Sequence, residues 1–300
     1  MATECMSGLE RKLMRQILLS MALTVAAIGV KAQGYVDQEK TASLSDAQSA
    51  SVDHIQKVVW HVYDYKKVAT ASKKGPWTQL LNHLDSLPGG QQGLRREIVE
   101  LANRVTGDKL KTGRKLVIPS AFPDDYKAYS PYPFHYAAAA DFPKLFIIDK
   151  YTQTFGAYEN GQLVRWGLVS TGTTNNLTPN GKFNFTWKAE YRESSAAPPG
   201  EVWEMRYMFN FEPKEGIHVH QYALPISSPA SHGCVRVSMA DAIWNYHWAD
   251  GSQGKTKGTP VWVINHNPVG RAAHWYATES GGVRSLVRLP EDDKDAFANN

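Results

Sequence analysis

The chain has 300 residues, of which 42% are hydrophobic and 21% are charged, and its formal net charge is +4. A chain of this size and composition can bury a substantial core, which argues against a disordered protein and is compatible with about two domains. The small charge, with no run of Lys and Arg between aromatic residues, argues against a nucleic-acid-binding protein.

Residues 1–32 are expected to form an export signal. Basic residues in "ERKLMRQ" precede the apolar run "ILLSMALTVAAIGV", and Val30 and Ala32 supply the small residues that a signal peptidase recognises. An uncleaved membrane anchor is the alternative, although 14 apolar residues are short for a membrane span. We therefore expect an exported protein of the periplasm or cell wall, which contacts the membrane only through this segment if the signal is not cleaved.

The next two segments differ in composition. Residues 33–57 are polar and rich in Ser, Ala and Asp, which is typical of a linker. Residues 58–122 begin with the β-rich run "VVWHVYDY" and end with a second one, and between them Ile98 and Leu101 lie on one helical face with Ala102 and Val105. This order predicts a small domain with a strand, a helix and a strand.

The rest of the chain is predicted to be mainly β. Residues 123–143 are rich in Pro and Tyr and are expected to be a linker that packs on its neighbours, and 144–266 contain β-rich runs broken at "ENG" and "STG", as in an antiparallel meander. One helix is expected after Ser238, which can cap it, with Met239, Ile243 and Tyr246 as its apolar stripe. The tail, 267–300, is expected to be peripheral, although its "HWYAT" sequence can pack back.

Cys5 lies before the apolar run and would leave with the signal, so the mature chain retains one cysteine, Cys234. An unpaired thiol in an oxidising compartment cannot form an internal disulfide. Its retention indicates either a chemical role or a buried, inert side chain. The cysteine count alone does not separate these two interpretations.

Histidines cluster around this cysteine, because His218, His220 and His232 lie within the 16 preceding positions. His218 and His220 are two apart on an expected strand, so both side chains point to one face. Either imidazole can take the thiol proton, and such a neighbour is expected to lower the thiol pKa. The backbone amides of Gly233 and Cys234 are candidate donors to an oxyanion.

The remaining candidates allow more than one role. Arg236 has a planar guanidinium that suits a substrate carboxylate or the carbonyls of the loop, and Ser231 can bind substrate or shape the loop. His218 and His220 with His232 and Cys234 also make a set of ligands that zinc accepts. Structural zinc sites more often use several cysteines, so we expect no metal and no cofactor.

The string "SHGCVR" at 231–236, with "TPNG" at 178–181 upstream, resembles the catalytic domain of the L,D-transpeptidases of the YkuD/ErfK type. The resemblance covers about Lys144 to His266. It implies a metal-free β-sandwich cysteine acyltransferase, with Cys234 as the nucleophile and an upstream histidine as the general base. Leu-Pro and Pro-Ala-Ser anchors align through His220, which we favour, whereas the spacing to the cysteine favours His218, the runner-up.

This resemblance implies that the partners are peptidoglycan stem peptides, as donor and acceptor. The implied activity is formation of 3-3 crosslinks or exchange or release of the terminal D-residue. An L,D-carboxypeptidase, a protein-anchoring enzyme and an inactive peptidoglycan-binding protein are the alternatives.

A second, shorter resemblance concerns the sequence "ELANRVTGDKLKTGRKLVIP". It resembles the second half of a LysM module, which implies a small α+β domain over 58–122 and contact with glycan strands. The expected fold class is therefore mainly β, with an L,D-transpeptidase-type sandwich and a small α+β LysM-like N-terminal domain.

Overall fold

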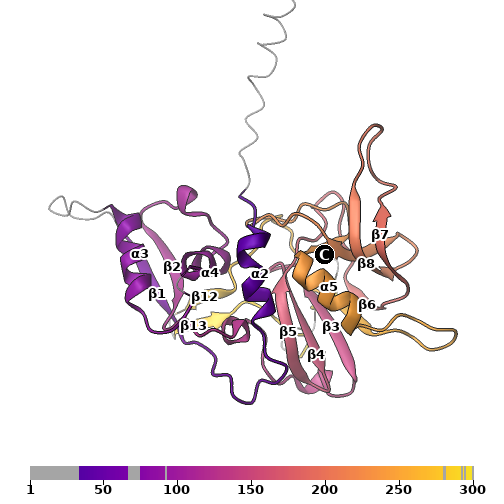
Figure 1. Ribbon diagram of the computed structural model, residues 1–300, viewed down its shortest axis with the longest axis horizontal. Helices are drawn as coiled ribbons and strands as arrows, with labels where there is room; N and C mark the ends of the chain where they lie inside the picture. Colours follow the sequence, from indigo (N-terminus) through magenta and orange to yellow (C-terminus); the bar gives the residue numbers. More distant parts are fainter. Residues whose placement is uncertain are drawn as a thin grey trace, which may run out of the picture. The chain divides into compact units, whose positions relative to one another are not determined.

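The computed structural model describes residues 34–66, 75–91, 93–279, 282–291, 293 and 295–298 (Figure 1). The described part of Gly34–Asn300 forms one compact unit. The predicted export signal lies outside the described residues. Among the helices that are described, none is both long and apolar enough to cross a membrane.

The segment expected to hold a strand, a helix and a strand contains two helices. Its elements in chain order are β1 (Trp60–Tyr65), α3 (Pro76–Ser86), α4 (Arg95–Ala102), a 3-10 turn (Gly107–Lys109) and β2 (Arg114–Pro119). The two strands pair antiparallel, with Trp60 opposite Pro119 and Tyr65 opposite Arg114. Ile98, Leu101 and Ala102 are buried, as the predicted helical face requires.

The end of α4 is fixed to β2 by one buried side chain, Asn103. Its amide nitrogen donates to the carbonyls of Val99 and Val117, both at 2.8 Å, and its amide oxygen accepts from the backbone N–H of Val117 at 2.9 Å. A buried amide whose donors and acceptor are all paired contributes to a unique arrangement of the helix on the strand.

Residues 33–57, which we expected to be a linker, instead contain helix α2 (Gln38–Asp46). Asp37 caps the helix by accepting from the backbone N–H of Lys40 at 3.0 Å. The side chain of Gln38 donates to the carbonyl of Tyr222 at 2.7 Å and accepts from the backbone N–H of Met239 at 3.2 Å. Polar composition alone did not reveal these long-range contacts.

The chain just before α2 lies along the segment that leads to the predicted nucleophile. The backbone N–H of Val36 donates to the carbonyl of Leu224, and that of Ile226 donates to the carbonyl of Gly34, both at 2.8 Å. Residues 34–38 are therefore an integral part of the fold.

Two sheets make up the rest of the structure. The five-stranded sheet has the order β5 (Gln162–Leu168), β4 (Thr154–Glu159), β3 (Lys144–Asp149), β11 (Pro260–Ile264), β6 (Gly181–Asn184). The four-stranded sheet has the order β10 (Val235–Val237), β9 (Ile217–Gln221), β8 (Glu204–Glu212), β7 (Lys188–Glu193). The predicted meander is present in β3, β4 and β5, which pair antiparallel in sequence order.

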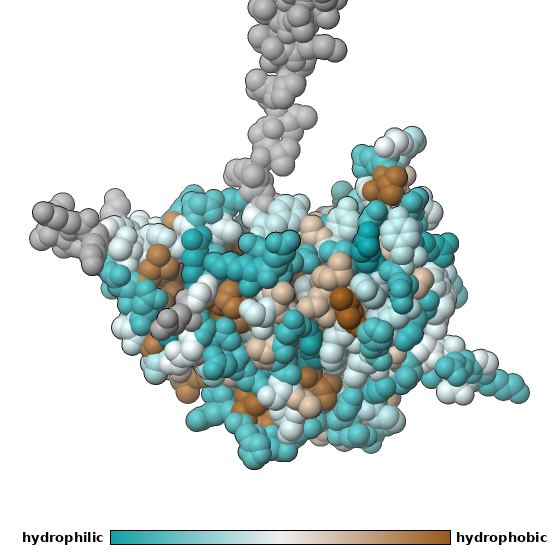
Figure 2. Space-filling model, viewed as in Figure 1, coloured by the Kyte–Doolittle hydropathy of each residue, from teal (hydrophilic) through white to brown (hydrophobic). Residues whose placement is uncertain are grey.

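Both sheets contribute to a single apolar core, which makes this part of the chain a β-sandwich. Phe185 lies between them, because its ring centroid is 4.3 Å from that of Phe209 in β8 and 5.6 Å from that of Phe146 in β3. The fold class is therefore mainly β, as predicted. On the face drawn in Figure 2 most side chains are hydrophilic and the apolar ones form separate spots.

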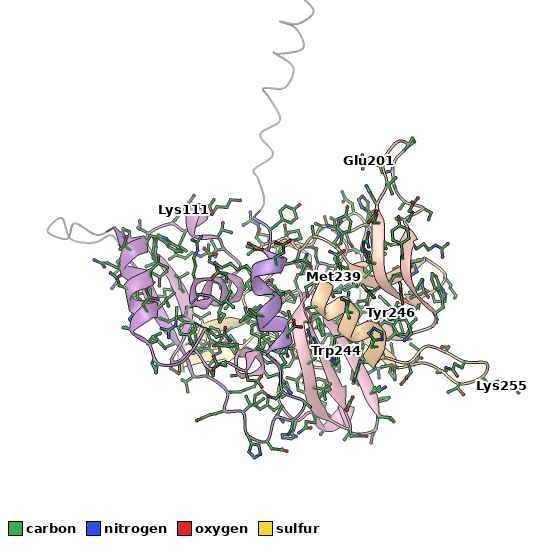
Figure 3. The ribbon with its side chains drawn as sticks, viewed as in Figure 1. Lys111, Glu201, Met239, Trp244, Tyr246 and Lys255 are labelled. Carbon is green, nitrogen blue, oxygen red and sulfur yellow. The ribbon has the colours of Figure 1, made fainter. Side chains whose placement is uncertain are left out.

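Helix α5 (Met239–Trp248) begins where predicted, and the Ser238 hydroxyl accepts from the backbone N–H of Asp241 at 3.1 Å. The predicted apolar stripe is wrong, because the buried residues of α5 are Asp241, Ala242 and Asn245. Asp241 faces inward because its carboxylate accepts from Arg165 Nε at 2.8 Å in a buried ion pair. Figure 3 labels two of the outer side chains, Met239 and Tyr246.

Aromatic residues from the flanking segments are buried against each other. Residues 123–143 contribute Tyr126, Tyr129 and Tyr132, all buried, as expected for a linker that packs on its neighbours. The tail adds a small sheet of β12 (Tyr276–Glu279) and β13 (Gly282–Ser285).

The tail residue Trp275 is fully buried. Its ring lies edge-on to Trp166 at 4.9 Å and to Trp60 at 6.5 Å. The "HWYAT" sequence therefore packs back, and this part of the tail is not peripheral.

Truncation of Trp275 to alanine is expected to lower the free energy of unfolding by roughly 3–5 kcal/mol, because it empties a site filled by a large ring. Chemical denaturation monitored by circular dichroism measures the change. Val269→Ala, at a tail residue that is 72% exposed, is the matched control and should stay within about 0.5 kcal/mol of wild type. Equal stability of the two variants would mean that the tail does not pack in solution.

Candidate active site

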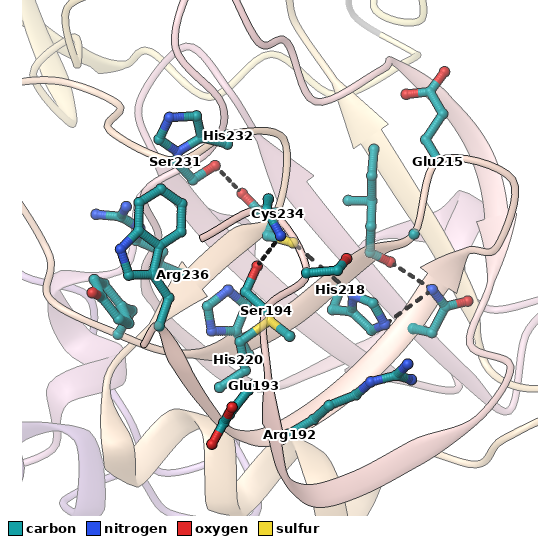
Figure 4. A pocket seen from close by; sticks show the side chains of 18 of the residues that line it. Arg192, Glu193, Ser194, Glu215, His218, His220, Ser231, His232, Cys234 and Arg236 are labelled. Carbon is teal, nitrogen blue, oxygen red and sulfur yellow. Dashed lines mark hydrogen bonds between the residues drawn. The ribbon is translucent and has the colours of Figure 1, made fainter. Parts of the chain in front are cut away.

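One cavity of about 320 Å³ brings the predicted site residues together (Figure 4). Its walls come from β9, from the loop before β10 and from the hairpin of β7 and β8. The predicted residues among its lining are His218, His220, Ser231, His232, Cys234 and Arg236. Cys234 is a free, partly exposed cysteine, so it is open to the cavity.

The pairing of β9 with β10 decides which histidine meets the thiol. The strands are parallel, with Val235 opposite Val219 and Arg236 opposite His220. Cys234 precedes Val235 and therefore lies beside His218, and the distance from Cys234 Sγ to His218 Nδ1 is 4.0 Å.

The histidine beside the thiol is therefore His218, the runner-up, and not His220, which we favoured. His220 is buried two register positions further along the sheet, opposite Arg236, and its Nδ1 lies 2.9 Å from the carbonyl oxygen of Gln221. Both histidines share a face, as predicted from their spacing, but the thiol reaches only one of them. The register of β9 against β10, which places His218 beside the thiol, cannot be read from the sequence.

Two residues that the sequence did not single out hold the His218 ring. The amide nitrogen of Asn210 is 3.3 Å from His218 Nε2 and also donates to the carbonyl of Ile217 at 3.1 Å. The ring of Trp187 lies edge-on to the imidazole, with 5.1 Å between centroids. Asn210 lies on β8, which pairs with β9, and Trp187 directly precedes β7, the next strand of the same sheet, so only the strand pairing could have identified them.

Ser231 shapes the loop that carries the nucleophile. Its hydroxyl donates to the carbonyl of Cys234 and accepts from the backbone N–H of Gly233 at 3.2 Å. Gly233 has a φ of +118°, which only glycine adopts readily. The Gly233 N–H, predicted to donate to an oxyanion, is therefore not free to do so in this arrangement, because it already donates to the Ser231 hydroxyl.

A second hydroxyl fixes the same loop from the other side. Thr178 Oγ1 donates to the carbonyl of Gly233 at 2.6 Å and accepts from the backbone N–H of Gly172 at 2.9 Å. The carbonyl of Thr178 in turn accepts from Lys150 Nζ at 2.6 Å. The "TPNG" and "STG" motifs, which lie far from Cys234 in the sequence, thus meet at the residue that precedes it.

The other two candidates differ in their contacts. His232 is exposed, and its ring lies 5.0 Å from that of Trp203 in the hairpin. The guanidinium of Arg236 lies over the ring of Tyr222 at 4.6 Å. In the described part of the chain no side-chain hydrogen bond or ion pair of Arg236 is present, so this residue does not hold loop carbonyls.

The protonation states follow from burial. Burial raises the pKa of the Cys234 thiol, while a hydrogen bond from the His218 backbone N–H and the charge of Arg236 act in the opposite direction. Burial, and secondarily the charge of Arg192, lowers the pKa of His218 to about 4. The resting pair at neutral pH is therefore a thiol and a neutral imidazole, which corrects the expectation that the histidine lowers the thiol pKa.

The ligand set considered for zinc does not converge. His232 packs on Trp203, and His220 bonds to its neighbour's carbonyl. No group of three or more His, Cys, Asp or Glu side chains placed to hold a metal ion occurs within the described ranges.

Residues 143–263 match the family model of the L,D-transpeptidase catalytic domain, YkuD, which confirms the resemblance. Comparison with curated proteins found no match. Among solved structures, the L,D-transpeptidase LdtMt1 in complex with imipenem is 17% identical, with 50% of this chain and 63% of that chain covered and a TM-score of 0.36. An L,D-transpeptidase from Stackebrandtia nassauensis is 25% identical, with 42% of this chain and 57% of that chain covered and a TM-score of 0.35. A mutant Enterococcus faecium L,D-transpeptidase is 20% identical, with 40% of this chain and 49% of that chain covered and a TM-score of 0.33. The chain thus spans less than two thirds of the length of each of these proteins.

Thr178→Val is expected to lower the free energy of unfolding by roughly 2–4 kcal/mol, because it leaves the buried N–H of Gly172 and carbonyl of Gly233 without partners. Thr178→Ser keeps the hydroxyl and should cost much less. Chemical denaturation of both variants tests this prediction. A serine variant as unstable as the valine variant would assign the effect to the methyl group instead.

Alkylation of Cys234 by iodoacetamide is expected to have a pH midpoint at or above the ordinary thiol value of about 8.5, because the buried thiol is neutral at rest. His218→Ala should leave this midpoint nearly unchanged. The rate is followed by intact-protein mass spectrometry under pseudo-first-order conditions. A midpoint below neutrality that rises in the alanine variant would instead show a resting ion pair of thiolate and imidazolium.

Proposed function

We propose, from the match of residues 143–263 to the L,D-transpeptidase catalytic domain, that this chain is an L,D-transpeptidase that acts on peptidoglycan stem peptides through a thioester on Cys234. The observation that carries the proposal is the 4.0 Å distance between Cys234 Sγ and His218 Nδ1 within an accessible cavity. A thiol and an imidazole in this arrangement are suited to acyl transfer.

In the first step the sulfur attacks the carbonyl on the L-side of the bond between the third residue and the terminal D-alanine. His218 Nδ1 takes the thiol proton as the carbon–sulfur bond forms. The carbon–nitrogen bond then breaks, and the same proton passes to the departing amine. General-base catalysis by a neutral imidazole fits the lowered pKa of His218, because the ring is unprotonated before the attack.

This role requires Nδ1 to be unprotonated and the ring proton to be on Nε2. A hydrogen bond between the imidazole and the backbone of Gly216 raises the His218 pKa against the effect of burial. This contact stabilises the imidazolium that forms transiently during the attack. In this tautomer Nε2–H cannot accept from the amide nitrogen of Asn210, so the edge-on ring of Trp187 is the contact that fixes the plane of the imidazole.

The tetrahedral intermediate requires donors for its oxyanion. We place this oxygen at the backbone N–H of Cys234, with the Gly233 N–H joining it when the Ser231 hydroxyl turns away. Donors of this kind are most effective in a site that excludes water. Ser231 therefore controls whether the second donor is available.

The thioester is then resolved by the side-chain amine of a second stem, which forms a 3-3 crosslink. Water as the acceptor would make the chain an L,D-carboxypeptidase, and a protein amine would make it an anchoring enzyme. The hairpin of β7 and β8 contributes Trp187 and Trp203 to the cavity wall. These large rings reduce the access of water to the thioester, which favours an amine acceptor.

The proposal carries two further expectations. The chain is exported to the periplasm or cell wall, where its substrate is found, and residues 58–122 contact glycan strands as a LysM-like domain. The arrangement of two helices and two paired strands in this segment is compatible with such a domain.

Incubation of the protein with tetrapeptide-bearing muropeptides is expected to release D-alanine and form crosslinked dimers, as detected by mass spectrometry. Cys234→Ser should abolish both products, and His218→Gln should lower the rate by roughly 10²–10⁴-fold. His220→Gln, matched in chemistry but away from the thiol, should retain most of the activity.

Each other outcome has a clear meaning. D-Alanine release without dimers would identify a carboxypeptidase, and binding to sacculi without any turnover would identify an inactive peptidoglycan-binding protein. Equal activity of the Cys234→Ser variant would reject the proposed nucleophile. A larger loss for His220→Gln than for His218→Gln would restore His220 as the base.

A further inference from the structure

We infer that Arg236 recognises a carboxylate on the acyl half of the donor, the half that remains on the enzyme as the thioester. This inference rests on the proposed function and adds to it a residue that determines donor specificity. It is drawn from the contacts of the guanidinium and from its position relative to the nucleophile and the base.

Arg236 is a cation in the cavity wall that has no anionic partner among the described residues. Arg165, by comparison, donates to the carboxylate of Asp241 at 2.8 Å. The Arg236 side chain lines the cavity, is partly buried and lacks any hydrogen bond or ion pair to the described residues. A guanidinium that is partly removed from water without a partner loses hydration, so an anionic ligand would bind there favourably.

The guanidinium is nevertheless held in place. It stacks on the ring of Tyr222 at 4.6 Å, and Tyr35 also lies near enough to interact with its charge. Stacking leaves the N–H groups at the edge of the plane free to form two parallel hydrogen bonds. This is the geometry that recognises a carboxylate rather than a hydroxyl or an amide.

Three glutamates line the cavity, and Figure 4 draws one of them, Glu215, on the other side of Cys234 from Arg236. The carboxylate of Glu204 pairs with Arg206 at 2.8 Å, and that of Glu193 accepts from the hydroxyl of Tyr191 at 3.2 Å. Neither forms an ion pair with Arg236. The anion that completes this site therefore has to come with the ligand.

The position of the base indicates which half of the donor Arg236 meets. The leaving nitrogen must receive its proton from His218, which lies beside Cys234 across the sheet. Arg236 lies two residues further along β10, and Figure 4 draws His218 and Arg236 on different sides of Cys234. The leaving D-residue occupies the side of His218, so the side of Arg236 accommodates the acyl half.

The test uses synthetic tetrapeptide donors of three kinds. One has free carboxylates throughout, one has its acyl-half carboxylates converted to carboxamides, and one has only the terminal D-residue converted to a carboxamide. Initial rates of thioester formation on Cys234 are measured by intact-protein mass spectrometry across donor concentrations, which gives kcat/KM for each donor.

For the wild type, the acyl-half carboxamide donor should show a kcat/KM about 10–100-fold below that of the free-acid donor, as expected for loss of a charge-assisted pair. Arg236→Gln should lower kcat/KM for the free-acid donor to the same extent and show no further loss with the acyl-half carboxamide. The ratio of kcat/KM between the free-acid donor and the donor with a terminal carboxamide should be the same in Arg236→Gln as in the wild type. Arg236→Lys keeps the charge but cannot form two parallel hydrogen bonds, so its kcat/KM for the free-acid donor should lie between the values of the wild type and Arg236→Gln.

Arg192→Gln is the matched control, because Arg192 also lines the cavity but lies on the β7 strand of the hairpin. It should keep the discrimination against the acyl-half carboxamide. The thermal midpoint and the alkylation rate of Cys234 show whether each variant is folded with its thiol accessible.

Three results would overturn the inference. Arg236→Gln could keep the full preference for the free acyl-half carboxylate, it could lose only the preference at the terminal residue, or Arg192→Gln could abolish the acyl-half preference. Failure of the wild type to form a thioester with any donor would instead reject the proposed function, and the inference with it.

Discussion

The site depends on the parallel pairing of β9 with β10. This pairing places Cys234 beside His218 and Arg236 beside His220. A shift by one residue would turn the thiol to the opposite face of the sheet, because side chains alternate along a strand. Cys234, His218 and Arg236 are thus fixed relative to each other mainly by the backbone hydrogen bonds of the paired strands.

The sheet positions Cys234 from one side, and two hydroxyl groups position it from the other. Thr178 and Ser231 bond to backbone atoms of Gly233 and Cys234, so the loop has little freedom where it joins β10. Buried hydrogen bonds of this kind are costly to leave unmade. They hold the thiol in a partly buried position, 4.0 Å from His218 Nδ1.

The sequence predicted the mainly β class, the meander and the cap of α5, because each has a local signal such as a turn motif or a capping residue. The "SHGCVR" string singled out Cys234, which the structure places in the cavity wall. It did not predict that His218 would be the partner of the thiol, because strand register depends on pairing between distant segments. The apolar stripe of α5 was predicted wrongly for a related reason. Burial of Asp241 follows from its pairing with Arg165, which only the tertiary fold brings near. Helix α2 was missed because its contacts to Tyr222 and Met239 have no local pattern.

The contacts of residues 34–38 have a consequence for the order of assembly. Gln38 is 184 positions from Tyr222, so these bonds close one of the longest loops in the chain. Contacts of such separation form late, because the entropy of loop closure must be overcome first. During synthesis, residues 34–38 remain unpaired until the segment around Leu224 has been made. Docking of residues 34–38 beside the segment that leads to Cys234 is therefore expected to be a late step in folding.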